Sequence, residues 1–304
     1  MPGLTKKEIE NLKKAGSILA KVREEARQFV KTDLSLLEIA ETIEKKIIES
    51  GAKPAFPVNL SINEMSAHST PSYNDETLAS GLLKVDLGCH INGFCADTAF
   101  SIDLSSDSEE SKENKSLIKT AELSLSQALK IAKLSVSLSQ IGSVIEKTAE
   151  SQNALSIRNL SGHSIEQYEL HSGITIPNFN NSSQISLEEG TYAIEPFVTL
   201  PSASGKVRDG GPSGIYKIES PGNVRDSFAR EVLAFIIEEY QGLPFCSRWI
   251  YKKFGAKGLL ALRQIEQAGI LHHYKQLIES SGKKVAQAEH TILVLKDETI
   301  VTTL

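Results

Sequence analysis

An Asn-Gly pair, Asn92-Gly93, lies between two apolar stretches and constrains the fold more than any other feature of the sequence. Asn-Gly is the preferred pair for a two-residue type I′ turn, because both residues tolerate positive φ angles. The pair therefore predicts an antiparallel hairpin in which Gly88 faces Asp97. Because side chains alternate between the two faces of a strand, Asp86 and Asp97 are predicted to lie diagonally on one face beside Gly88.

The two predicted neighbours are both carboxylates, and this demands an explanation. Two anions on one face repel each other unless a cation joins them or one takes up a proton. The rest of residues 81–100 is largely apolar, which argues against an exposed hairpin with scattered acids. This stretch alone leaves two interpretations open, a metal site at Asp86 and Asp97 or an exposed acidic hairpin.

Composition and charge exclude several classes of protein. With 304 residues, 40% hydrophobic and 23% charged, the chain is expected to be soluble and globular. A net charge of −5 gives no general attraction to nucleic acid. The start lacks the apolar core of a signal peptide, and no apolar run approaches the ~20 residues of a membrane span. Three irregularly spaced cysteines are too few for a disulfide framework, so we expect reduced thiols in the cytoplasm: Cys89, Cys95 and Cys246.

Apolar periodicity predicts paired helices on both sides of the hairpin. Residues 5–30 and 35–50 repeat apolar side chains at three- and four-residue steps. Capping boxes are predicted at Thr5 with Glu8 and at Ser35 with Glu38. The other predicted elements are a polar surface loop at 105–114, helices at 117–134 and 138–151, and strands at 157–160, 191–200, 285–295 and 299–304. The order of helix, helix, hairpin and then helix, helix, strand suggests two similar halves.

The character of the chain changes from about residue 203 onwards. A stretch rich in Gly, Ser and Pro at 205–222 is followed by predicted helices at 225–240, 247–254 and 257–268. These lie between two strand-rich regions. We therefore expect one catalytic domain over residues 1–304, with a helical subdomain inserted at 203–272.

Three further residues downstream have the side chains of metal ligands. Glu195 and Glu289 each lie inside an apolar strand, where a carboxylate is costly unless it is paired or metal-bound. His163 follows a predicted strand, where a lone histidine is more often structural than a ligand. Together with the two aspartates they form an oxygen-rich set with one imidazole, which suits divalent ions such as Mn, Fe, Co or Zn. A pair of such ions is typical of metal-assisted hydrolysis.

The motifs around these residues resemble those of the type II methionine aminopeptidases, in their compact archaeal form. The matching segments run in order over nearly the whole chain and are residues 54–68, 84–99, 162–165, 170–173, 193–197 and 286–291. The resemblance implies an α+β pita-bread fold, in which two pseudo-symmetric halves surround a curved antiparallel sheet. It also implies that the inserted helical subdomain is winged-helix-like.

The resemblance implies a role for each site residue. Five residues would bind two divalent metal ions (Co, Mn, Fe or Zn): Asp86, Asp97, His163, Glu195 and Glu289. Of these, Asp97 and Glu289 would bridge the two ions. Glu195 would also move the proton of a water or hydroxide that bridges the metals. His68 and His171 would lie at the scissile amide. Phe56, Leu170 and Phe197 would line the pocket for the substrate side chain.

The activity implied is removal of the N-terminal methionine from nascent polypeptides or peptides with a small second residue. The resemblance also implies a cytoplasmic monomer. Its partners would be the substrate and, transiently, the ribosome, and it would bind neither a membrane nor a specific nucleic acid. The chain departs from the family pattern at Ser69, where tyrosine is usual, and at Ala288, where an aromatic residue is common. These departures affect the expected pocket shape rather than the ligands.

Three other interpretations fit parts of the pattern. A prolidase or aminopeptidase P would use the same five ligands, but these enzymes usually carry an extra N-terminal domain. A non-catalytic binding protein of the same fold would be expected to lose ligands, whereas all five are present here. The insert alone could be a nucleic-acid-binding winged helix, but no basic recognition helix stands out in it.

Overall fold

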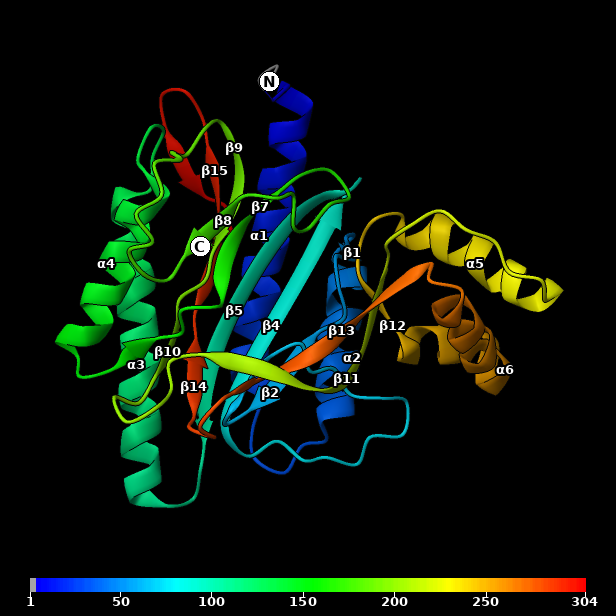
Figure 1. Ribbon diagram of the computed structural model, residues 1–304, viewed down its shortest axis with the longest axis horizontal. Coiled ribbons are helices and arrows are strands. Elements are labelled where there is room, and N and C mark those ends of the chain that lie inside the picture. The colour runs from blue at the N-terminus through cyan, green and yellow to red at the C-terminus, as the bar shows by residue number, and fades with distance from the viewer. Residues whose placement is uncertain (1–3) are drawn as a thin grey trace.

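The computed structural model describes residues 4–304, so the first three residues of the expected 1–304 domain lie outside it. One curved antiparallel sheet of nine strands forms the centre of the molecule (Figure 1). Seven strands follow one another across it in the order β1 (Lys53–Pro54), β4 (Gly81–Ile91), β5 (Phe94–Leu104), β15 (Glu289–Val294), β9 (Gly190–Ile194), β7 (Ser161–Ile165) and β8 (Thr175–Pro177). The other two are β2 (Asn59–Ile62), which pairs with β4, and β16 (Thr299–Val301), which pairs with β15.

The hairpin of β4 and β5 has the register that the sequence predicts. Gly88 pairs with Asp97, and the strands pair continuously from the Gly81–Leu104 end to the turn. Asn92 and Gly93 have φ angles of 52° and 84°, as a type I′ turn requires. Gly88 also leaves space for a neighbouring side chain, since a Cβ there would lie 2.2 Å from the Phe56 ring.

Helix α1 (Lys6–Phe29) covers β4 and β5, helix α2 (Leu36–Glu49) packs against α1, β1 and β2, and both helices bury a common hydrophobic core with the hairpin. The capping box of Thr5 and Glu8 is confirmed. At α2 the predicted box is wrong in detail. Ser35 accepts a hydrogen bond from the Leu37 N–H, and its backbone forms an isolated β-bridge with Leu78.

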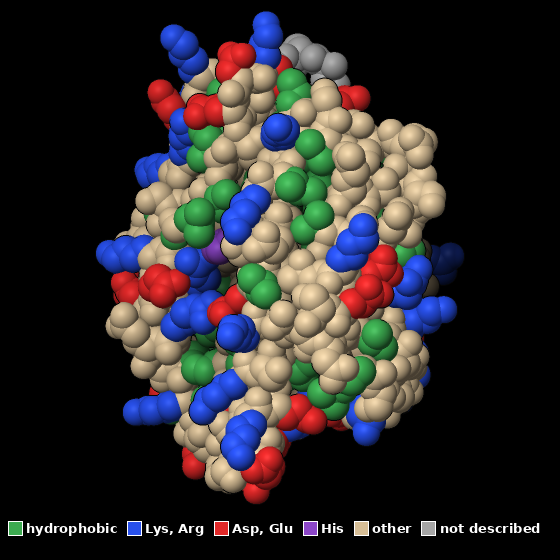
Figure 2. Space-filling model, turned by 90° about the vertical axis from the view of Figure 1, so that its left-hand side faces the viewer, with side chains coloured by type: hydrophobic (Ala, Val, Ile, Leu, Met, Phe, Trp, Pro, Cys, Tyr) green, Lys and Arg blue, Asp and Glu red, His purple; other side chains and the backbone are tan. Residues whose placement is uncertain are grey.

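Helices α3 (Ser108–Ile131) and α4 (Leu138–Ser151) cover the other half of the sheet and share a second core with β9 and β15. Their outer face carries charged side chains of both signs (Figure 2). The surface loop expected at 105–114 is wrong, because α3 begins at Ser108. Asp107 caps the helix by accepting from two backbone N–H groups, and acidic residues in the first turn favour the positive end of the helix dipole.

Helices α5 (Ser227–Tyr240) and α6 (Ser247–Gln267) lie on one side of the molecule, beyond β1 (Figure 1). They pack on a sheet of β12 (Phe245–Cys246), β11 (Val207–Ile218), β13 (Leu271–Glu279) and β3 (Met65–Ala67), in that order, and bury a third core. The expected break near residue 255 is present as a kink at Gly255, where φ is 64°.

The Gly-, Ser- and Pro-rich stretch contains a twelve-residue strand, β11, which turn-forming composition did not predict. Pairing with β13 supports this strand, and its register shifts on both sides of Pro212.

Several predicted strands have different bounds. The strand expected at 157–160 lies between β6 (Leu155–Ser156) and β7, and the one expected at 191–200 is interrupted at Glu195-Pro196, between β9 and β10 (Phe197–Thr199). The C-terminal region divides into β14 (Val285–Gln287), β15 and β16, with β14, β10 and β6 forming a small sheet of their own. All three cysteines are buried free thiols. Within residues 4–304, no helix is long and apolar enough to cross a membrane.

Candidate metal centre

A cavity of about 400 Å³ opens at the concave centre of the molecule. All ten residues that the sequence analysis assigned to the site line it: Phe56, His68, Asp86, Asp97, His163, Leu170, His171, Glu195, Phe197 and Glu289. They come from segments that are far apart in the chain. The fold therefore brings the whole predicted set to one place.

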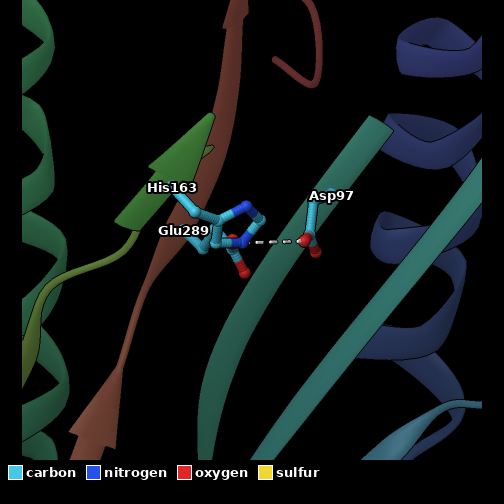
Figure 3. Close-up of side chains that lie close together, drawn as sticks. All are labelled: Asp97, His163 and Glu289. Carbon is cyan, nitrogen blue, oxygen red and sulfur yellow. Dashed lines mark ion pairs between the residues drawn. The ribbon is translucent and has the colours of Figure 1, made fainter. Parts of the chain in front are cut away.

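Three of these residues form a compact group at the floor of the cavity. Asp97 on β5, His163 on β7 and Glu289 on β15 each offer one ligand atom, and these atoms all lie within 4.8 Å of one another (Figure 3). The sheet order explains the convergence. Strand β15 lies between β5 and β9, Glu289 pairs with Ala99, and His163 pairs with Ala193 of β9.

The imidazole of His163 also approaches a second carboxylate. Its Nε2 lies 3.6 Å from Oδ2 of Asp97 and 3.7 Å from Oε1 of Glu195. Asp86 lines the same cavity from β4, two residues along that strand from the partner of Asp97. Asp86 and Glu195 extend the compact group to five potential ligands.

The carboxylates lie close to one another, and no lysine or arginine among residues 4–304 contributes to the shifts in their pKa values. Burial, followed by the neighbouring carboxylates, raises the pKa values of Asp97 and Glu289 well above their usual range. Burial likewise raises the pKa of Asp86 to about 7. Such a cluster is stabilised when a cation neutralises it.

Two carboxylate oxygens in the cluster provide a direct test of fit to a metal. Among the described residues, buried Oδ1 of Asp86 and Oδ1 of Asp97 have no hydrogen-bond partner. Buried polar atoms are rarely left unpaired, and carboxylate oxygens with an imidazole form a usual donor set for divalent transition metals. The residues present therefore fit a metal centre.

His68 and His171 line the cavity above this group. The His171 ring packs edge-on against that of His163, with centroids 4.3 Å apart. His68 has a left-handed backbone with a φ of 56°, and its Nδ1 lies 3.3 Å from the carbonyl oxygen of Lys275. Burial lowers the pKa of His68 to about 4, so its imidazole is neutral at physiological pH.

The cavity also contains polar residues to which the sequence analysis gave no role. Asn59 and Tyr274 line it, and Gln287 donates from Nε2 to Oε2 of Glu195 over 3.4 Å. Asn59 and Gln287 fall within the matching motifs, but neutral amides carry no charge whose burial would signal a site. Tyr274 comes from β13.

Comparison with known proteins agrees with this geometry. Residues 10–295 match the model of metallopeptidase family M24. The methionine aminopeptidase of Pyrococcus abyssi is 44% identical over 301 residues, covering 97% of this chain and 99% of the relative. The structure of a methionine aminopeptidase from Thermotoga maritima aligns with a TM-score of 0.69 at 22% identity, covering 99% of this chain and 98% of that chain. A thermophilic Arx1 aligns with a TM-score of 0.82 at 15% identity, covering 98% and 91%, and shares the fold.

The chain belongs to metallopeptidase family M24 and is a metal-dependent hydrolase with the pita-bread fold. Within that family it belongs with the methionine aminopeptidases, which makes it an exopeptidase acting at the amino end. The predicted class of enzyme and fold are thereby confirmed.

Proposed function

We propose that the protein removes the N-terminal methionine from peptides and nascent polypeptides whose second residue is small, using two divalent ions. The main support is that one ligand atom from each of Asp97, His163 and Glu289 lies within 4.8 Å of the others, beside carboxylate oxygens without a hydrogen-bond partner among the described residues. Asp86 and Glu195 would complete the set, so that Asp86, Asp97, His163, Glu195 and Glu289 would together hold the two ions. The ions are Co, Mn, Fe or Zn, all of which accept carboxylate and imidazole donors.

When bound, the metal ions lower the pKa of a water and polarise the substrate carbonyl. The chain's own residues supply proton transfer and orientation. Glu195 takes a proton from the attacking water at a carboxylate oxygen and delivers it to the leaving amine. His68 lies near the scissile nitrogen and His171 near the scissile carbonyl, both as neutral imidazoles, and His171 can donate a hydrogen bond to the carbonyl oxygen as it gains charge.

The apolar part of the cavity suits a methionine side chain. Phe56, Leu170 and Phe197 are all buried at the cavity wall, and Phe56 and Leu170 belong to one hydrophobic cluster. Aromatic rings make favourable contacts with a thioether sulfur. These three residues are proposed to select methionine at the substrate's first position.

The proposal extends to the organisation of the molecule. We propose one catalytic domain with residues 203–272 as an inserted helical subdomain of type II character, since α5 and α6 bury a core of their own. We further propose a cytoplasmic monomer that meets its substrates at the ribosome transiently, without binding a membrane or a specific nucleic acid.

The test is release of free methionine by protein loaded with Mn or Co. Methionine should be released from Met-Gly and Met-Ala peptides, while a Met-Lys peptide should remain intact because its second side chain is large. Xaa-Pro peptides serve as the control for prolidase activity. If no metal supports release, the interpretation as a non-catalytic binding protein replaces the enzyme.

A further inference from the structure

A buried ion pair joins the inserted region to the N-terminal half. Arg248, at the start of α6, is 0% exposed, and its Nη1 and Nη2 each donate to one carboxylate oxygen of Glu44 over 2.7 Å. Glu44 lies on α2 and also accepts from the indole N–H of Trp249 over 2.9 Å. The bidentate geometry fixes the orientation of both side chains.

The remaining contacts of the pair reach two loops. Nε of Arg248 donates to the carbonyl oxygen of Pro71 over 3.1 Å, and Oε1 of Glu44 accepts from the Val58 N–H over 3.3 Å. The hydroxyl of Thr70 donates to the Val58 carbonyl over 2.8 Å, which joins the two loops directly. One ion pair therefore holds both loops against α2 and α6.

These two loops carry cavity residues. The first loop carries Phe56 two residues before Val58, and the second follows His68 three residues before Pro71. His68 adopts a left-handed backbone with a φ of 56°, which a non-glycine residue keeps only when its surroundings enforce it. Its ring is held from the other side by the Lys275 carbonyl of β13. The segment that contains His68 is thus restrained at two points, by Arg248 at the Pro71 carbonyl and by β13 at the His68 ring.

Stability alone is a weak reason for this pair. Replacing a buried ion pair with apolar side chains of similar volume is often neutral or stabilising, because both charges lose their hydration. A guanidinium offers something that an apolar core does not, namely several donors in a fixed planar fork. In Arg248 one donor of this fork, Nε, bonds to the Pro71 carbonyl in a loop near the cavity.

We propose that Arg248 is a positioning residue, which sets the placement of His68 through its hydrogen bond to Pro71 and so couples the inserted region to the active site. This rests on the proposed role of His68 in amide cleavage. Glu44 orients the guanidinium and holds the neighbouring loop at Val58.

The test is Arg248→Lys in the full-length, metal-loaded protein. Lysine keeps the charge opposite Glu44 but lacks the fork that reaches Pro71. We expect kcat for a Met-Ala peptide to fall by about tenfold or more, since small misplacements of catalytic groups are costly. In a His68→Ala background, the same substitution should lower kcat by less than about twofold, because residues acting through one another are not additive. Equal losses in both backgrounds would overturn the proposal.

A second variant and a second measurement keep the inference separate from folding and from the proposed function. Thr70→Val removes the link between the loops while preserving shape, and should lower kcat in the same direction. Hydrogen exchange of residues 65–72 should increase in Arg248→Lys but not in Asp103→Asn, a control placed at the end of β5. Unchanged exchange would overturn the proposal even if the protein released no methionine, whereas absence of release by the unmodified protein would overturn the proposed function alone.

Discussion

His163 is the one imidazole among the five proposed metal ligands, and the other four are carboxylates. His163→Ala should lower metal affinity by at least about tenfold and abolish methionine release. Even substitutions of residues that only hydrogen-bond to a metal ligand lower metal affinity by about tenfold or more. Isothermal titration with Mn, together with the peptide assay, measures both effects. His272→Ala is the matched control, because that imidazole lies on β13 outside the cavity and is 43% exposed. Full metal binding by His163→Ala would show that the centre lies elsewhere.

Charge decided which site residues could be predicted at this scale. Glu195 and Glu289 stood out because a carboxylate in an apolar strand carries a cost that must be offset. Arg248 gave no such signal, since its partner Glu44 is about 200 residues away and only the fold brings them together. Asn59 lines the cavity and Gln287 donates to Glu195, but neither carries a charge, so these positions could not be read from the sequence.

Elements with strong local signals were predicted well, and those that depend on distant partners were not. The Asn92-Gly93 turn set the register of β4 and β5 because a two-residue turn admits few alternatives. The composition of β11 is typical of turns, yet the segment forms a strand because it pairs with β13, which lies about 60 residues further along the chain. The first turns of α3 were read as a loop because their polar residues suit both a loop and a capped helix start.

The start of α3 allows a pH-dependent test. Asp103 accepts hydrogen bonds from Ser105, Ser111 and Asn114, and these lower its pKa to about 2 against the cost of burial. A carboxylate with a lowered pKa contributes stability above its unfolded value near 4 and loses that contribution as pH falls to about 2.

Asp103→Asn should therefore cost about 1–2 kcal/mol of unfolding free energy at pH 6, allowing for solvent screening, and almost none near pH 2. Urea unfolding at several pH values measures this difference. Lys112→Met is the control, because its ion pair with Glu109 is exposed on α3, the helix whose first turns Asp103 contacts. A penalty that stayed constant between pH 6 and pH 2 would contradict the assigned role of the charge.

The molecule as a whole is built from two halves that meet at the metal centre. Asp86 and Asp97 belong to the hairpin under α1 and α2, whereas His163 and Glu195 come from the half under α3 and α4. Glu289 lies on β15, and this strand lies between the two halves because it pairs with both β5 and β9. The carboxylates that repel one another therefore lie at the junction of the two halves. A cation bound there would neutralise this repulsion and so stabilise the contact between the halves.

Removing the metal should therefore destabilise the whole molecule rather than one half. The five proposed ligands are dispersed in the unfolded chain, so a metal ion should bind only the folded state, and at 100 times Kd it would add about 2.7 kcal/mol of stability. For a chain of this size the loaded protein should melt roughly 5 °C above the chelated protein. Scanning calorimetry in the presence of Mn or of a chelator measures the shift. Glu289→Gln should lose most of that shift while its metal-free form melts no lower than the unmodified metal-free protein, because one repelling charge has been removed. An unchanged melting temperature on chelation would mean that the carboxylate cluster is stable without a cation, which its burial and mutual repulsion argue against.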